Sequence, residues 1–170
     1  MKGPGGGGGE SSSSAQKRRR PEPSPTQRAL GLLTRREHSR QELARKLAHR
    51  GVAAEDAQAA IDKLAAAGWQ DDARFAASVV RNRASAGYGP AFIRAELGMH
   101  GLGSEAIVFA MEGFEGDWMD NARGLLARRH PKAVAGDRTA QHKAADFLLR
   151  RGFSMEQVRA ALRGSLDAGG

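Results

Sequence analysis

Apolar residues recur along this chain every three or four positions, which is the spacing of an amphipathic helix. In the segment SRQELARKLAHRG, Leu43 and Leu47 lie one turn apart on one face, and Ser39 stands three residues before Glu42 in the pattern of a capping box. Gly51 follows where a helix commonly ends in a residue of positive φ. The segment EDAQAAIDKLAAAG has the same design. No segment alternates with a period of two, so the sequence predicts helices and no sheet.

Three stretches of the chain share one pattern and align without gaps. They are LAHRGVAAEDAQAAI, LGMHGLGSEAIVFAM and LLRRGFSMEQVRAAL, at residues 47–61, 97–111 and 148–162. In each, a leucine comes first, a glycine follows four residues later, an apolar residue comes next, and a glutamate stands at the ninth position. The pattern predicts an all-α fold of three tandem three-helix repeats, nine helices in total, forming an elongated curved solenoid. Such a body offers long surfaces for binding another macromolecule and no single deep pocket.

The composition divides the chain into a tail and three units. Residues 1–27 are rich in Gly, Ser and Pro and contain no Leu, Ile, Val or Phe, so they are predicted to form a disordered N-terminal tail. The tail includes the basic run Lys17–Arg20. The three repeats are expected at residues 28–70, 71–116 and 117–166.

The adjacent carboxylates of Asp71 and Asp72 permit two interpretations. A metal site or an acid–base pair would need further ligands, and the histidines of the chain show no ligand spacing such as HExxH. At a helix N-terminus, by contrast, carboxylates satisfy free N–H groups and oppose the helix dipole. We therefore expect the pair to begin a helix. We also expect no catalytic residue, no metal and no cofactor. We therefore expect that the protein is not an enzyme.

Charge gives the first indication of a partner. The chain has 27 Lys and Arg residues against 19 Asp and Glu residues, a formal net charge of +8. A basic protein attracts polyanions, most often nucleic acid. Basic residues recur in every unit, and as a set they can follow a phosphate backbone or an acidic protein surface, although any single one can equally be solvated or paired to an acid. The candidate basic face consists of Arg35, Arg36, Arg40, Arg45, Lys46, Arg50, Arg81, Arg83, Arg94, Arg128, Arg129, Arg150 and Arg151.

Several classes of protein are disfavoured by what the sequence lacks. It contains no cysteine, which excludes disulfides and thiolate zinc sites. No apolar run approaches the roughly 20 residues that cross a bilayer, and the N-terminus lacks the apolar centre of a secretory signal. We therefore expect a cytoplasmic protein with no membrane partner.

The segments GWQDDARFAASVVRNR and GYGPAFIRAELGMHGL together resemble the central signature of the RecX family of recombinase regulators. The flanking segments SRQELARKLAHRGV and AADFLLRRGFSMEQVRAAL resemble its first and third repeats. The resemblance covers about residues 28–163 and leaves out the tail. It implies three tandem three-helix repeats in a curved molecule without catalytic residues.

The resemblance also implies a function. A RecX-like protein binds the RecA protein filament on single-stranded DNA, lies in its helical groove, and lowers ATP hydrolysis, strand exchange and co-protease activity. Nonspecific binding to single- and double-stranded DNA is implied as well, and a monomer is expected.

Two alternative functions remain. One is a freestanding DNA-binding protein, either nonspecific or built on helix-turn-helix units. The other is a helical adaptor that binds an acidic protein without DNA.

Overall fold

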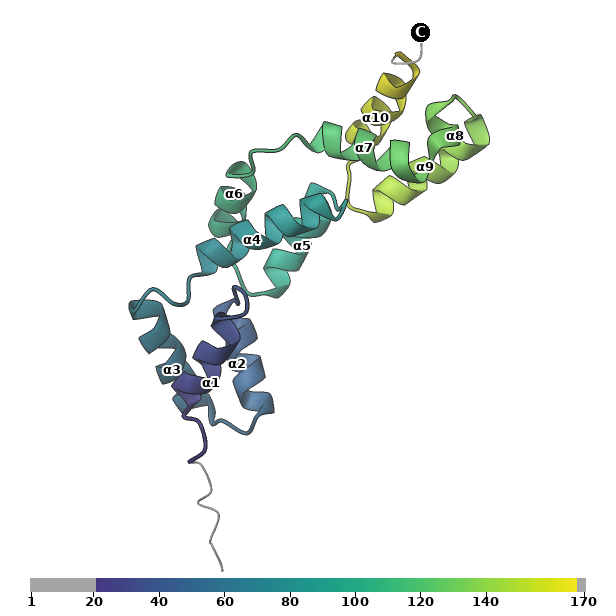
Figure 1. Cartoon of the computed structure of the whole chain (residues 1–170). Helices are drawn as coiled ribbons and strands as arrows, with labels where there is room; N and C mark the ends of the chain where they lie inside the picture. The colour runs from purple at the N-terminus through teal and green to yellow at the C-terminus, as the bar shows by residue number, and fades with distance from the viewer. Residues whose placement is uncertain (1–20, 168–170) are drawn as a thin grey trace, which may run out of the picture.

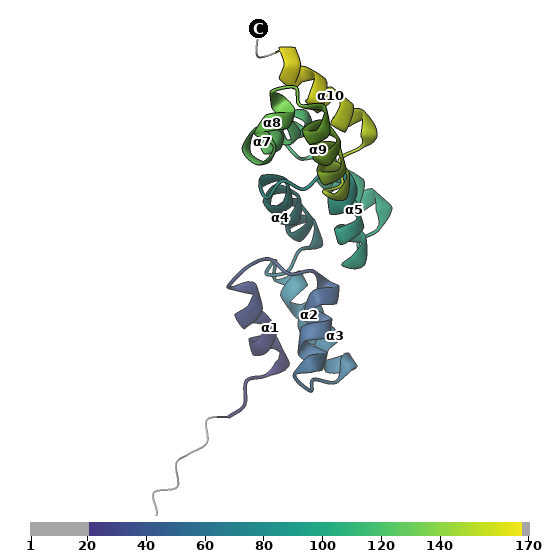
Figure 2. The same cartoon turned by 90° about the vertical axis from the view of Figure 1, so that its right-hand side faces the viewer.

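The computed structural model describes residues 21–167, and the regular secondary structure in that range is entirely helical. The helices are α1 (Pro25–Leu33), α2 (Arg40–His49), α3 (Ala54–Ala66), α4 (Asp72–Ser85), α5 (Pro90–Met99), α6 (Ser104–Glu112), α7 (Trp118–Arg129), α8 (Pro131–Val134), α9 (Arg138–Arg150) and α10 (Met155–Asp167). They form an elongated, curved body that runs from α1 at one end to α10 at the other (Figures 1 and 2). Most of the expected disordered tail, including its basic run, lies outside the described residues.

Each repeat has a small hydrophobic core of its own. In the first, Leu43 and Leu47 of α2 are fully buried against α1 and α3. In the second, Ile93 and Leu97 of α5 hold the same place between α4 and α6. In the third, Leu148 of α9 is buried among side chains of α7, α8 and α10. Three thin cores in a row, in place of one thick core, confirm the stacked-repeat fold.

The repeated glycines end the middle helices as expected. Gly51, Gly101 and Gly152 have φ values of 80°, 77° and 89°. A residue with a Cβ rarely adopts this left-handed conformation, which explains why glycine recurs at the position. The turn then directs the next apolar side chain back into the core of its repeat.

The first helix begins before the expected unit boundary at residue 28. Ser24 and Gln27 form a reciprocal capping box: the Ser24 hydroxyl accepts from the Gln27 N–H at 3.2 Å, and the Gln27 side chain accepts from the Ser24 N–H at 2.9 Å. Pro25 occupies the first helical position, where its missing N–H has no cost. The motif SPTQ therefore begins α1 at Pro25, inside the segment that the composition assigned to the tail.

The expected count of nine helices is wrong for the described residues, because the third repeat contains the additional short helix α8. The chain leaves α7 at His130, whose φ and ψ of −136° and 54° are not helical. Pro131 disfavours helical geometry at the residue before it and then starts the new turn at N1. Ala133 of α8 is fully buried in the third core.

Two joints connect the repeats, and they differ in kind. The first joint, between repeats one and two, is made by side chains: Arg74 Nε donates to Glu37 Oε1 at 2.9 Å, and Ser39 Oγ lies 3.3 Å from His100 Nδ1. The second joint, between repeats two and three, is made by main chain. There the Gly89 N–H donates to the Arg151 carbonyl at 2.7 Å, and the Ala91 N–H donates to the Gly152 carbonyl at 3.0 Å.

Candidate polyanion-binding surface

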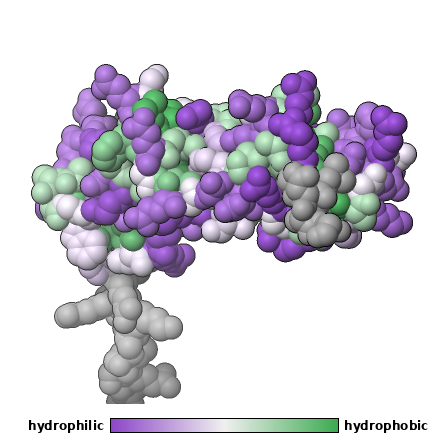
Figure 3. Space-filling view, turned by 90° about the horizontal axis from the view of Figure 1, so that it is seen from above, coloured by the Kyte–Doolittle hydropathy of each residue, from purple (hydrophilic) through white to green (hydrophobic). Residues whose placement is uncertain are grey.

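Hydrophilic side chains are distributed over the face seen in Figure 3, so the question is which cations are free and lie close together. Arg45 and Arg50, which form no ion pair with described residues, line one hollow along α2 together with Lys46, whose Nζ lies 3.6 Å from the Glu42 carboxylate. Arg50 also lines an adjoining hollow with Arg28 and Arg35. The turn after α1 and the C-terminal half of α2 place these residues, and cations near a helix C-terminus are favoured by its dipole. Arg35, Arg45, Lys46 and Arg50 are called the α2 basic cluster below.

Three other predicted cations are paired inside the molecule. Arg83 of α4 donates through Nε and Nη2 to the Glu96 carboxylate of α5, both at 2.7 Å, and this contact raises the pKa of Arg83. Arg36 forms a two-pronged contact with Glu42, and Arg40 pairs with Asp62. Arg83 and Arg40 connect neighbouring helices and Arg36 connects the turn after α1 to α2, so we do not assign these three arginines to a polyanion-binding face.

Arg151 stabilises the second joint. Its guanidinium lies 4.6 Å from the ring centre of Tyr88 and 5.1 Å from that of Phe147, and Nη1 donates to the Ala86 carbonyl at 3.0 Å. A cation held between two aromatic rings and a carbonyl contributes to the packing of the repeats. Arg151 belongs to the predicted basic face, and the sequence pattern does not indicate its place between the two rings.

The remaining predicted cations are exposed but are not gathered with the α2 basic cluster into one site. Arg81, Arg94, Arg128, Arg129 and Arg150 make no ion pair with any residue in the described part of the chain. Arg129 lines a hollow together with Lys132 and Lys143, two lysines that sequence reasoning missed. Lys132 lies in α8, which has no counterpart in the other repeats, so the repeat pattern gave no indication of this group.

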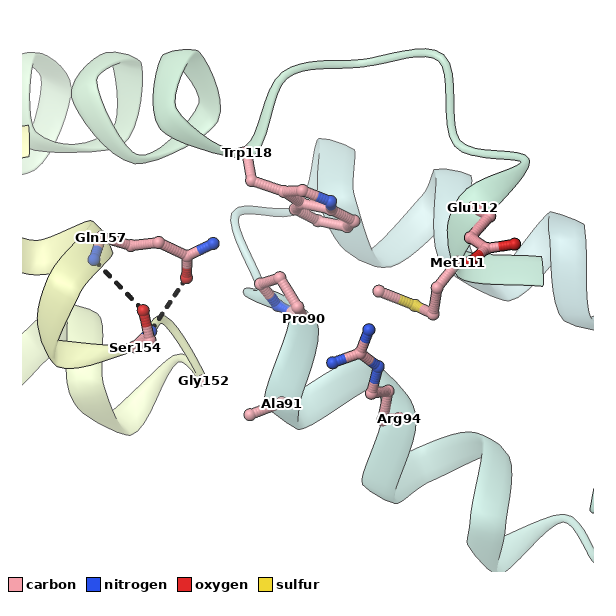
Figure 4. Close-up of a pocket in the computed structure, with 9 residues that line it drawn as sticks. All are labelled: Pro90, Ala91, Arg94, Met111, Glu112, Trp118, Gly152, Ser154 and Gln157. Atoms are coloured by element: carbon pink, nitrogen blue, oxygen red, sulfur yellow. Dashed lines mark hydrogen bonds between the residues drawn. The ribbon is translucent and has the colours of Figure 1, made fainter. Parts of the chain in front are cut away.

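A pocket of about 390 Å³ lies between the second and third repeats (Figure 4). The guanidinium of Arg94 and the side chain of Met111 extend into it below the indole of Trp118. On the opposite wall, Ser154 and Gln157 form a capping box at the start of α10. The Gln157 side chain accepts from the Ser154 N–H at 2.9 Å, and the Ser154 hydroxyl accepts from the Gln157 N–H at 3.1 Å. The Ser154 hydroxyl is thereby committed to a structural role. Over the described residues there is no group of three side chains that could hold a metal ion.

The two adjacent carboxylates have separate structural roles. Asp71 caps α4, since its Oδ1 accepts from the N–H groups of Ala73 and Arg74 at 2.7 and 3.1 Å. This confirms the helix-start interpretation for Asp71. Asp72 instead turns toward the first repeat, where its Oδ1 accepts from the N–H of Arg40 at 3.0 Å. It therefore also satisfies the beginning of α2 across the first joint, while it occupies the first position of α4, so the prediction that both carboxylates begin a helix is confirmed.

The capping box predicted at Ser39 and Glu42 is only half formed. Ser39 Oγ accepts from the Glu42 N–H at 3.0 Å, but the Glu42 carboxylate contacts Arg36 and lies 3.0 Å from His38 Nδ1. Charged partners bind a carboxylate more strongly than a backbone N–H does, which explains why Glu42 does not complete the capping box.

Burial lowers the pKa of His38, although the nearby Glu42 carboxylate opposes this change. Burial alone would raise the pKa of Glu42, but Arg36 and His38 outweigh it and hold the pKa below its usual value.

This buried pair predicts that the protein loses stability in acid in two stages. The pKa of His38 is lower in the folded protein than its ordinary 6.5, so the unfolded chain binds the proton first and stability falls as the pH drops through 6.5. Glu42 adds a second loss below its ordinary 4.5. His38→Gln should flatten the first stage and diminish the second without removing it, because Arg36 still lowers the pKa of Glu42 whereas His38 no longer does; the urea midpoint from about pH 7.5 to about pH 3.5 measures both stages. His142→Gln, at an exposed position, is the control. An unchanged first stage in His38→Gln would contradict the assignment.

The fold and its surface define a class: helical-repeat proteins whose long surface is suited to binding another macromolecule. Models of the first, second and third three-helix domains of RecX match residues 26–64, 71–111 and 115–162 of this chain. The chain belongs to the RecX family of regulatory proteins. No helix of the described part has the length and apolar character needed to cross a bilayer.

Similar proteins support this membership. The regulatory protein RecX of Xanthomonas oryzae pv. oryzae strain PXO99A is 60% identical over 146 residues, which cover 86% of this chain and 90% of the relative. That of Stenotrophomonas maltophilia strain R551-3 is 59% identical over 142 residues, covering 84% and 87%. The crystal structure of RecX from Lactobacillus salivarius matches with a TM-score of 0.70 at 22% identity, covers 85% of this chain and 95% of that one, and shows the shared fold.

Proposed function

We propose that this protein binds RecA filaments on single-stranded DNA and inhibits their ATPase, strand-exchange and co-protease activities without catalysing a reaction itself. The observation that carries the proposal is the match of all three RecX domains along one elongated body. The α2 basic cluster supports it further, because Arg35, Arg45 and Arg50 are exposed and make no ion pair with other described residues.

The proposed mechanism is physical restraint. A recombinase filament on DNA is a long polyanionic helix, and a basic elongated molecule is attracted to its groove by the phosphate charge. A molecule that contacts neighbouring protomers slows both the exchange of protomers and the closure between them that accompanies ATP turnover. We infer that the protein acts as a cytoplasmic monomer and that its second and third units correspond to residues 71–116 and 117–166, while the first ends near residue 70 and begins with α1 at Pro25.

The ATPase activity of RecA on single-stranded DNA, measured while this protein is titrated in, tests the proposal. Inhibition is expected at well below one molecule per RecA protomer, because each bound molecule would restrain more than one protomer. Filament binding that leaves ATP hydrolysis and strand exchange unchanged at saturation would contradict the inhibitory mechanism.

A second candidate function is direct DNA binding, which the unpaired cations of the α2 basic cluster favour. A mobility-shift comparison of unrelated DNA sequences separates its two forms. Equal and salt-sensitive binding indicates a nonspecific contact to phosphates, whereas a strong preference for one sequence indicates a helix-turn-helix regulator. Retained binding to a protein partner after nuclease treatment would instead favour an adaptor that needs no DNA.

A further inference from the structure

Helix α6 exposes a large aromatic side chain to solvent. Phe109 is 73% exposed and Val108 is 47% exposed, while the opposite face of the helix buries Met111 in the second core. Glu105 lies one turn before this apolar pair and Glu112 one turn after it, at the i, i+3, i+4 and i+7 spacing that places four side chains on one face. Glu105, Val108, Phe109 and Glu112 are called the α6 stripe below.

The repeat fold does not require this exposed pair. In the alignment of the three repeats, Val108 and Phe109 correspond to Gln58 and Ala59 of α3 and to Arg159 and Ala160 of α10. Those helices pack in the same way with polar or small residues at the two positions. A pair of adjacent apolar side chains exposed at positions where the other two repeats have polar or small residues is a feature of binding surfaces.

The electrostatic setting of the α6 stripe restricts its partner. Residues 95–122 contain six Asp and Glu residues and no Lys or Arg, in a chain whose formal net charge is +8. DNA phosphates and anionic lipids are repelled by such a segment. A symmetric contact between two copies of this chain would bring the glutamates of one stripe against those of the other, which is also unfavourable. The remaining partner is a protein surface with positive charge and a pocket for an aromatic ring.

We propose that the α6 stripe is the docking surface for a basic, apolar patch on the partner protein, and that Phe109 is its anchor. This inference rests on the proposed function, in which the partner is the RecA protomer. Binding would then be divided between two surfaces, with the α2 basic cluster attracted to phosphate and the α6 stripe to protein. In Figure 1, α6 lies at the outer edge of the second repeat, where a partner can reach it.

The test replaces the apolar pair by the residues that the first repeat has at the same positions. Val108→Gln/Phe109→Ala should fold normally, because both side chains are exposed and α3 tolerates Gln58 and Ala59 there. Affinity for RecA filaments on single-stranded DNA should fall at least about tenfold, as for loss of an interface anchor. Affinity for the same DNA without RecA should stay within about twofold. Fluorescence anisotropy measures both, and Met155→Ala, which removes another half-exposed apolar side chain, is the control.

A charge variant tests the acidic part of the stripe. Glu105→Lys should weaken filament binding and strengthen binding to DNA alone. Glu55→Lys is the matched control, because Glu55 is exposed in the first turn of α3 as Glu105 is in that of α6, so both variants lose the same helix-dipole interaction. Equal effects of the two variants on filament binding would overturn the proposal.

The outcomes separate this inference from the proposed function. If the wild-type protein binds filaments and Val108→Gln/Phe109→Ala binds them with the same affinity, the docking surface is overturned and the proposed function stands. Absence of wild-type binding to filaments overturns both. Sedimentation velocity adds one more arm: a concentration-dependent dimer that Phe109→Ala abolishes would assign the stripe to a second copy of the chain and overturn the proposal.

Discussion

Replacing Gly89 with alanine should uncouple the third repeat from the second. A Cβ at Gly89 would lie 2.5 Å from the carbonyl carbon and oxygen of Gly152 and from the nitrogen of Phe153. Backbone atoms cannot rotate away as a side chain does, so the second joint must open and lose its two main-chain hydrogen bonds. We expect a loss of about 3 kcal/mol from overpacking and broken hydrogen bonds together. Filament inhibition should fall as well, because the third repeat would no longer be held in line.

Urea unfolding measures this change. In a Trp69→Phe background, Trp118 is the only tryptophan and reports on the start of α7. An early transition of Trp118 fluorescence, separate from the main loss of helical circular dichroism, is expected for Gly89→Ala. Gly98→Ala is the matched control: it lies inside α5 with no atom within 4 Å of an added Cβ. That control should gain about 0.5 to 1 kcal/mol from its helix propensity. A single transition in Gly89→Ala at the wild-type midpoint would contradict the close packing of the joint.

Reversing the charge of Arg45 and Arg50 together should have the largest effect on binding. Both side chains are exposed, both line the hollow along α2, and they form no ion pair with described residues, so the reversal breaks no salt bridge that the fold uses. Affinity for single-stranded DNA and for filaments should fall about 10- to 100-fold at low salt, and the dependence of binding on salt should become shallower. Anisotropy titrations at several salt concentrations measure both quantities.

The control keeps the same change in net charge. Lys63→Glu/Arg159→Glu reverses two exposed cations outside the α2 basic cluster. If binding depends on total charge alone, the two double variants will lose affinity equally, and the cluster would then have no special role. A variant at Arg83 is less informative, because its reversal also breaks the contact with Glu96 between α4 and α5.

The sequence predicted those features of the fold that have a local cause. Gly51, Gly101 and Gly152 recur because each turn needs a residue in the left-handed conformation. Such a turn can be recognised from the few residues around the glycine, without knowledge of the rest of the fold. Helix α8 was missed because it belongs to one repeat only, and His130 and Pro131 locally resemble a simple helix end.

The candidate site was harder to predict, because the state of each cation depends on residues distant in the chain. Arg83 lies 13 residues from its partner Glu96 in the sequence, and Asp72 lies 32 residues from Arg40, whose N–H donates to it. Helical spacing places a side chain on a face but does not say which acid lies on the neighbouring helix. The sequence therefore identified the basic residues as a set, whereas tertiary packing divides them into paired and free members.

The contrast between the two joints has a mechanical consequence. The second joint combines the Arg151 side chain with main-chain hydrogen bonds around Gly89 and Gly152, and backbone atoms cannot rotate away as side chains do, so we expect it to be the stiffer of the two. The first joint consists of contacts such as Arg74 with Glu37, which rotate, exchange with water and weaken with salt. The molecule is therefore expected to bend more easily at the first joint than at the second. On the proposed function, a change in the pitch of the bound filament would concentrate the bending strain at the first joint, and the second and third repeats would move together.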